Sequence, residues 1–305
     1  MTTRTRTSRP GRTTVVLAAL VVYLGVGGLF LLGVSSMLGA SGGGAGGLFG
    51  ARVAIVELEG LIVDVDDLVR ELKAHRENPV VRAVVLRINS PGGVVAPTQE
   101  LHDAIKRVRA AGKPVVASLG AVAASGGYYA AVAADRIYAN PGTLTGSIGV
   151  IMQLANFEAL MKKVGVDYVV VKAGQFKDAP SFARAMTPEE RRVLQALLDD
   201  VHGQFIGAVA AGRQLDRGQV AGFADGRVFS GAQARALHMV DALGGLEDAI
   251  EAAATLAGLP KPPKVIGPRR RISIMDLLRS QLGVPGLGAL RPVLPMFKTP
   301  LYLMD

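Results

Sequence analysis

The chain begins with a long apolar run that follows a short basic segment. Residues 13–34 contain no charged side chain, whereas residues 1–12 carry four arginines and no acid. The 22 residues of this run can cross a hydrocarbon core of about 30 Å as a helix, and a basic flank marks the cytoplasmic side. We expect a cytoplasmic N-terminus over residues 1–12, a transmembrane anchor over residues 13–38, and the rest of the chain outside the cytoplasm. A signal peptide cleaved near Ala40 stays open as the alternative.

From residue 51 the apolar positions alternate between two periods. Runs rich in Val, Ile and Ala predict buried strands, and runs with apolar residues three and four positions apart predict helices. The predicted strands are residues 53–58, 80–88, 114–119, 136–139 and 168–172. The predicted helices are residues 66–77, 98–111, 125–135, 157–164, 187–212, 231–237 and 247–256. This alternation predicts an α/β domain with mostly parallel strands, which we expect over residues 51–260.

Two segments without such a period flank this domain. Residues 39–50 are mainly glycine, which predicts a flexible linker. Residues 261–305 are rich in proline and charge and then apolar in patches, which predicts a loosely ordered tail. The basic residues 269–271 could contact anionic membrane lipid, and a solvated charge run is the alternative.

Composition excludes several kinds of chemistry. The 305 residues include no cysteine, so a cysteine nucleophile, disulfides and cysteine-bound zinc are excluded. The four histidines form no HExxH or HxH pair, which argues against a metal hydrolase. We therefore expect no metal and no cofactor, and a base supplied by histidine has no support in the pattern.

The net charge of +9 is confined to the flanking segments. Residues 51–260 carry 22 basic and 23 acidic residues, a net charge of −1. Nucleic-acid binding needs a basic excess on the folded body. We expect no nucleic-acid partner, and the flanking charge fits membrane topology instead.

Ser125 stands in the stretch around which the candidate chemistry is organised. Two alanines precede it, and Gly126, Gly127 and a run of helix formers follow. This order predicts a tight turn that opens a helix, with free backbone N–H groups and a partial positive charge beside the hydroxyl. Ser125 is a candidate nucleophile, and a plain helix cap is the alternative.

Three further stretches could complete such a site. Asn-Ser-Pro-Gly-Gly at residues 89–93 follows a predicted strand and could expose N–H groups as an oxyanion hole, or form an ordinary turn. Lys177 could act as a base if burial kept its amine neutral, although a loop lysine is usually solvated. The hydroxyls of residues 143–147 could orient that amine, or belong to a Gly-Ser turn. Together these stretches favour a Ser–Lys mechanism.

Four motifs in this order resemble the bacterial signal peptide peptidase family. They are Ile-Asn-Ser-Pro-Gly-Gly at 88–93, Ala-Ala-Ser-Gly-Gly-Tyr-Tyr at 123–129, Leu-Thr-Gly-Ser-Ile-Gly-Val at 144–150 and Gly-Gln-Phe-Lys-Asp at 174–178. The resemblance runs from about residue 53 to 245, includes the anchor and indicates the short form of the family. It does not cover the tail.

The resemblance implies a crotonase- and Clp-like α/β fold, which is a spiral of ββα repeats. It also implies that the protein is anchored in a bacterial cell membrane. Ser125 matches the nucleophile, Lys177 the general base, Gly92 the oxyanion-hole donor and Ser147 the hydroxyl that holds the lysine. It also implies a ring-shaped homo-oligomer in which neighbouring subunits contribute to each site.

We therefore expect a membrane-anchored serine endopeptidase that cuts signal peptides and other apolar peptides outside the cytoplasm. Residues 93–96 would pair with the substrate backbone as an added strand, so Gly93, Val94 and Val95 are candidate substrate-binding residues. Three alternatives stay open. The chain could trim membrane proteins with a stomatin-like partner, serve as a non-catalytic peptide-binding scaffold, or act on acyl-CoA as a crotonase.

Overall fold

The structure, a computed structural model, describes residues 50–268 and 301–303. The expected anchor over residues 13–38 and most of the glycine-rich linker lie outside the described residues. No helix in the described part of the chain combines the length and the hydropathy needed to cross a membrane.

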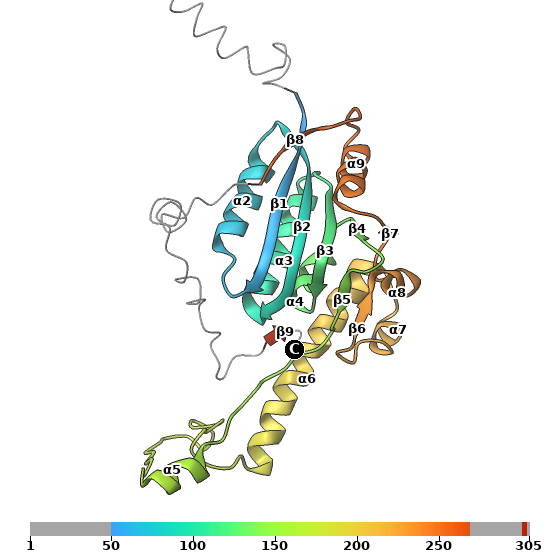
Figure 1. Cartoon of the computed structure of the whole chain (residues 1–305). Helices are drawn as coiled ribbons and strands as arrows, with labels where there is room; N and C mark the ends of the chain where they lie inside the picture. The colour runs from blue at the N-terminus through green and yellow to red at the C-terminus, as the bar shows by residue number, and fades with distance from the viewer. Residues whose placement is uncertain (1–49, 269–300, 304–305) are drawn as a thin grey trace, which may run out of the picture. The chain divides into compact units, whose positions relative to one another are not determined.

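Three long parallel strands form the centre of the domain (Figure 1). β1 (Arg52–Ile62) pairs with β2 (Val81–Val94), and β2 pairs with β3 (Val115–Ala124). The connections are the helices α2 (Asp66–Glu77) and α3 (Val95–Ala110). This arrangement confirms the α/β class and the parallel pairing expected from the alternating periods.

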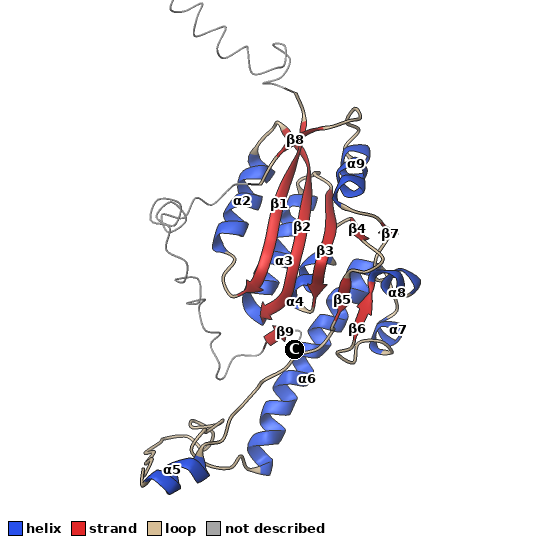
Figure 2. Cartoon of the chain, in the orientation of Figure 1, coloured by secondary structure: helices blue, strands red, loops and turns tan. Residues whose placement is uncertain are grey.

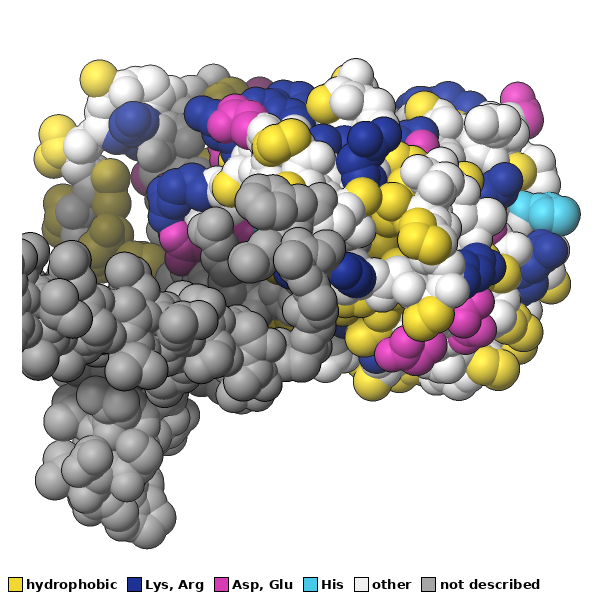
Figure 3. All heavy atoms as spheres, turned by 90° about the horizontal axis from the view of Figure 1, so that it is seen from above, with side chains coloured by type: hydrophobic (Ala, Val, Ile, Leu, Met, Phe, Trp, Pro, Cys, Tyr) yellow, Lys and Arg dark blue, Asp and Glu magenta, His cyan; other side chains and the backbone are white. Residues whose placement is uncertain are grey.

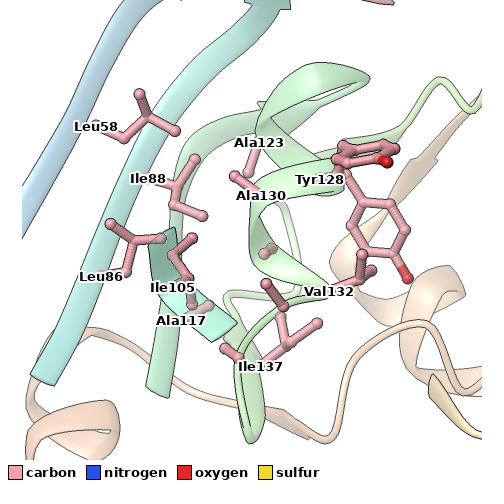
Figure 4. Packing of buried hydrophobic residues seen from close by; sticks show 14 of the residues in the cluster. Leu58, Leu86, Ile88, Ile105, Ala117, Ala123, Tyr128, Ala130, Val132 and Ile137 are labelled. Carbon is pink, nitrogen blue, oxygen red and sulfur yellow. The ribbon is translucent and has the colours of Figure 1, made fainter. Parts of the chain in front are cut away.

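The core lies on both faces of this sheet, as the nearly continuous apolar runs of its strands require. In β1, Ala54 and Val56 belong to the larger cluster, which includes residues of α2 and α3. Val53 and Ile55 belong to the smaller cluster with α9 (Leu246–Leu256). Figure 4 shows the larger cluster, where strand side chains such as Ile88 lie close to helix residues such as Ile105. Truncation of a side chain of this size in a core usually lowers the free energy of unfolding by about 2–5 kcal/mol.

Short strands extend the sheet, which has the order β6-β5-β3-β2-β1-β8. They are β4 (Arg136–Ala139), β5 (Leu144–Gly146), β6 (Val228–Ser230), β7 (Ala242–Leu243), β8 (Lys264–Ile266) and β9 (Leu301–Leu303). β3 pairs with β4 along its first half and with β5 along its second half. Two of the strands, β8 and β9, lie within residues 261–305, the segment expected to be a loosely ordered tail.

The remaining helices are α4 (Gly126–Ala131), α5 (Glu158–Val164), α6 (Pro188–Arg213), α7 (Arg217–Ala221) and α8 (Gly231–Ala236). The expected start of the long helix is confirmed at α6. Thr187 and Glu190 form a reciprocal capping box, and Pro188 is the first helical residue.

The predicted strand at residues 168–172 is wrong. This segment has no strand pairing, and most of the chain between β5 and α6 is loop (Figure 2). Val169 is 81% exposed and Val171 is 97% exposed. The β-branched residues favour extended backbone, but no neighbouring strand among the described residues satisfies their N–H and C=O groups.

Charged side chains are mixed on the face of the molecule that Figure 3 shows. Lys and Arg are interspersed there with Asp, Glu and hydrophobic side chains. This mixture agrees with the nearly equal numbers of basic and acidic residues among residues 51–260.

Candidate active site

Ser125 lies at a sharp turn between strand β3 and helix α4. Its φ of 51° and ψ of −117° are strained for a residue with a side chain and cost about 1–3 kcal/mol. A serine on a strained strand-to-helix turn is the arrangement known as a nucleophile elbow. Ser125 occupies the N-cap position, but its side chain accepts no capping hydrogen bond. Its Oγ is buried and has no partner among the described residues, so capping does not explain this hydroxyl.

Gly126 and Gly127 let the end of β2 lie against the start of α4. A Cβ on Gly126 would stand 3.2 Å from the Gly93 nitrogen and 3.2 Å from the Gly92 Cα. A Cβ on Gly127 would stand 2.7 Å from the Ser90 carbonyl oxygen. The backbone of residues 92–93 therefore reaches the turn that carries Ser125, as an oxyanion hole requires.

Gly126 is a candidate oxyanion donor that the sequence reasoning missed. The first N–H groups of a helix have no intrahelical acceptor, and Gly126 is the first residue of α4. In nucleophile elbows the residue after the nucleophile supplies such a donor. The signal for it was present, since Gly126 directly follows Ser125.

The N–H of Gly92, the expected oxyanion donor, is already engaged. It donates to the Ser90 Oγ at 3.1 Å, and Ser90 is fully buried. Gly92 has a φ of 108°, which glycine adopts far more readily than other residues. To bind an oxyanion, this N–H must exchange the Ser90 hydroxyl for the substrate oxygen.

Ser147 directly follows β5, the strand that pairs with the end of β3 just before Ser125. Ala124 and Gly146 are partners in the β3–β5 register. The Ser125 N–H donates to the Gly146 carbonyl oxygen at 2.7 Å. Ser147 is buried, has a φ of 50° and donates its N–H to the Arg227 carbonyl oxygen at 2.9 Å.

Lys177 is not part of this arrangement within one chain. It is exposed and lies in a turn between α5 and α6. The hollow that it lines is formed entirely by residues 168–182. The structure thus brings together Ser125, Ser147, Gly92 and Gly93, and it leaves Lys177 on a separate segment.

Strand β9 occupies the edge of β2 that we assigned to the substrate. Leu301, Tyr302 and Leu303 pair antiparallel with Val94, Gly93 and Gly92, respectively. Extended backbone ends there, because Val95 is the first residue of α3. The assignment of a substrate strand to residues 93–96 is therefore wrong for Val95 and Ala96, and a peptide strand can pair only with the end of β2.

Among the described residues, no group of three or more His, Cys, Asp and Glu side chains could hold a metal ion.

His102 packs edge-on against the ring of Tyr129, with ring centroids 5.0 Å apart, and its Nδ1 lies 3.3 Å from the Asp103 carboxylate. Burial lowers the pKa of His102, so its neutral form is favoured in the folded chain.

Comparison with known proteins identifies the family. The model of peptidase family S49 matches residues 107–260. A protein of Synechocystis sp. that is named as a protease, slr0021, is 48% identical over 216 residues, which are 70% of this chain and 77% of that protein. An Enterococcus faecium protein named as a signal peptide peptidase, SppA, is 36% identical over 59% of this chain and 53% of its own length.

Two further matches differ in length or in sequence. Protease 4 of Salmonella typhi is 36% identical over 69% of this chain, which spans only 35% of that protein. A solved structure of a ClpP1 mutant from Listeria monocytogenes aligns with 64% of this chain and 93% of its own, at 17% identity and a TM-score of 0.44. The family match and the Synechocystis relative establish that the chain belongs to peptidase family S49 and is a serine protease.

Proposed function

We propose that the chain is a membrane-anchored endopeptidase that hydrolyses signal peptides and other apolar peptides outside the cytoplasm. The observation that carries this proposal is the buried, unpartnered Oγ of Ser125 on a strained turn against the backbone of residues 92–93. A hydroxyl in such a place is ready for acyl transfer and has no structural task.

In the reaction that we propose, a neighbouring copy of the chain supplies Lys177. The Ser125 Oγ attacks the substrate carbonyl carbon, and its proton passes to the Lys177 amine. The N–H groups of Gly92 and Gly126 donate to the oxyanion of the tetrahedral intermediate. Lys177 then protonates the leaving amine, and the same residue activates the water that hydrolyses the acyl-enzyme. The Ser147 hydroxyl orients the lysine.

We assign the dyad to two neighbouring copies of the chain, because Ser125 is buried and Lys177 is exposed on a different segment. Large apolar side chains are exposed around that segment, including Leu160, Val169 and Val171. Several exposed large apolar side chains on one segment are typical of an interaction surface. Contact with a second copy would remove the Lys177 amine from water and bring it toward the nucleophile of that copy.

An extended peptide fits the edge that the substrate would use. An extended peptide can add as a strand to the end of β2, through backbone hydrogen bonds to residues 92–94. The Enterococcus relative, whose name is that of a signal peptide peptidase, supports the substrate class. The apolar run at residues 13–34 supports a place in the membrane where released signal peptides remain.

The test uses the full chain in detergent with a pool of signal peptides and mass spectrometry of the products. We expect cleavage by the wild type, none by Ser125→Ala or Lys177→Ala, and normal cleavage by Lys163→Ala, an exposed lysine of α5. A fluorophosphonate should label wild type but not Ser125→Ala. Wild-type rates in Ser125→Ala or Lys177→Ala would remove that residue from the mechanism, and peptide binding without cleavage would favour a scaffold.

A further inference from the structure

A cluster of charged side chains fastens the turn that carries Lys177 to the start of α6. Asp178, the next residue, accepts hydrogen bonds from Lys172 and from the Nε and Nη2 of Arg184, the last two at 3.2 and 2.9 Å. Arg184 also donates from Nη1 to the Glu190 Oε2 at 2.9 Å and from Nη2 to the other oxygen of that carboxylate. One guanidinium therefore joins two carboxylates.

Both carboxylates are ionised at neutral pH. Hydrogen bonds from Lys172 and then Arg184 lower the pKa of Asp178 to about 2. The hydrogen bond from Arg184 and the Thr187 N–H lower the pKa of Glu190 to about 2. These are charge-assisted hydrogen bonds, and the bidentate contact of Arg184 with Glu190 also fixes the direction of the guanidinium.

Glu190 is itself fixed in place, because it belongs to the capping box of α6. Its Oε2 accepts from the Thr187 N–H at 2.9 Å, and its own N–H donates to the Thr187 Oγ1 at 3.1 Å. Only 5% of the Glu190 side chain is exposed. The cluster thus holds Asp178 against a defined point on a 26-residue helix.

The other end of α6 is anchored in the core close to Ser125. Val201, Phe205 and Val209 of α6 are buried. The ring of Phe205 lies 5.0 Å, between centroids, from that of Tyr129 in α4, the helix that Ser125 opens. The helix α6 therefore links the Lys177 turn to the body of its own chain.

We propose that Arg184 is a positioning residue for the Lys177 amine. It holds Asp178, the residue next to Lys177, against Glu190 and so fixes where the lysine lies. This inference rests on the proposed role of Lys177 as the base. Inside the turn, the backbone hydrogen bonds are local ones, such as that from the Lys177 N–H to the Gly174 carbonyl oxygen at 3.2 Å. Local contacts give the turn its shape. The partly buried Arg184 bridge to Glu190, together with an exposed hydrogen bond from the Gln175 Nε2 to the Glu189 Oε2 at 3.0 Å, gives it a place on α6.

The inference predicts a loss in kcat with little change in KM. Arg184 touches neither the Ser125 turn nor the end of β2, so substrate binding there should persist. A displacement of about 1 Å at a catalytic group lowers the rate roughly 100-fold, so we expect Arg184→Gln to lower kcat by roughly 10- to 100-fold. Arg184→Lys should fall between this variant and wild type, because an ammonium cannot bond two carboxylates in a fork.

Three further variants separate positioning from other effects. Arg191→Gln removes an exposed guanidinium one residue beyond Glu190 and should leave kcat unchanged. Asp178→Asn should resemble Arg184→Gln, and the double variant should be no slower than either single one, because both remove the same bridge.

The experiment measures kcat, KM, the oligomeric state and the thermal unfolding of the full-length variants beside Lys177→Ala. Inactive Lys177→Ala with slow, correctly assembled Arg184→Gln supports the inference. Inactive Lys177→Ala with wild-type kcat in Arg184→Gln overturns the inference and leaves the proposed function intact. Full activity of Lys177→Ala overturns the proposed function itself. A loss of activity in Arg184→Gln and Arg184→Lys that follows dissociation or unfolding overturns the positioning role.

Discussion

Ser125 and Ser147 leave adjacent strands at the same level, both with positive φ angles, of 51° and 50°. The hydrogen bond from the Ser125 N–H to the carbonyl oxygen of Gly146 holds the two turns together at 2.7 Å. The pairing of β3 with β5 thus fixes the backbone of Ser147 beside the turn that carries Ser125.

Ser147→Ala should lower kcat without unfolding the protein. The substitution keeps the Cβ and the backbone contacts of Ser147, and it removes only the hydroxyl that we expect to orient the lysine. Loss of one positioned hydrogen bond to a base should slow the reaction roughly 10- to 100-fold. Steady-state kinetics and thermal unfolding measure the two effects. A wild-type kcat in Ser147→Ala would show that the Ser147 hydroxyl has no role in the mechanism.

Ser125→Gly should be more stable than Ser125→Ala, although both lack the nucleophile. Glycine adopts the positive φ of residue 125 without the strain of about 1–3 kcal/mol that a side chain brings. We expect the free energy of unfolding to be about 1 kcal/mol higher for the glycine variant, once glycine's larger unfolded-state entropy is included. Denaturant titrations measure it, and equal stabilities would argue against a strained turn.

Gly127→Ala should disturb both stability and activity. The new Cβ would stand 2.7 Å from the Ser90 carbonyl oxygen, so the end of β2 would have to move away from α4. Such overpacking usually costs about 1–3 kcal/mol, and it would also displace the oxyanion donors. Gly142→Ala is the matched control, because its Cβ would meet no atom within 4 Å. Equal kcat in the two variants would contradict the packing described for this site.

Removal of residues 301–305 should raise the apparent affinity for peptide substrates. Strand β9 pairs with Gly92, Gly93 and Val94, the edge that a substrate strand would use, so the two should compete. We expect a lower KM with unchanged kcat in the truncated protein, and inhibition by an added peptide with the sequence of residues 299–305. An unchanged KM and no inhibition by the peptide would show that substrates do not use this edge.

Acid should release the Lys177 turn from α6. The folded pKa of Asp178 and of Glu190 is lowered to about 2, below the usual values of about 4. Their contribution to stability is therefore present above about pH 4 and is lost as the pH falls toward 2. Hydrogen exchange of residues 172–190, corrected for intrinsic rates, should accelerate over this range in wild type. In Arg184→Gln exchange should already be fast at pH 5, and identical profiles would contradict the role of the cluster.

Local patterns were sufficient to predict most of the sheet and its helices. The apolar runs of β1, β2 and β3 are long and buried on both faces. The start of α6 could be predicted because Thr187 and Glu190 have the spacing of a capping box. The prediction of a strand at residues 168–172 is wrong for a physical reason. Their β-branched pattern is that of a strand, but a strand also needs a neighbour, and sequence does not show whether one exists.

The site was predictable where motif and turn coincide, and not where it depends on distant segments. The turn at Ser125 could be predicted from the residues around it, and the roles of Gly92 and Ser147 are predictions from the family resemblance. The hydrogen bond from the Gly92 N–H to the Ser90 hydroxyl could not be predicted from either. The pairing of β9 with β2 joins residues about two hundred positions apart. The Arg184 bridge joins residues only six positions apart, but Asp178 and Arg184 lie in irregular backbone, where no period shows which side chains meet. No local pattern signals either contact.

The most direct test of the central claim mixes two inactive full-length chains, Ser125→Ala and Lys177→Ala, with different affinity tags to confirm that mixed assemblies form. If the hydroxyl of one copy works with the amine of its neighbour, mixed assemblies contain sites with both groups and regain peptidase activity. If the two groups had to come from one chain, the mixed assemblies would stay inactive. If Lys177 were not the base, Lys177→Ala would already be active alone. Either result would contradict the account.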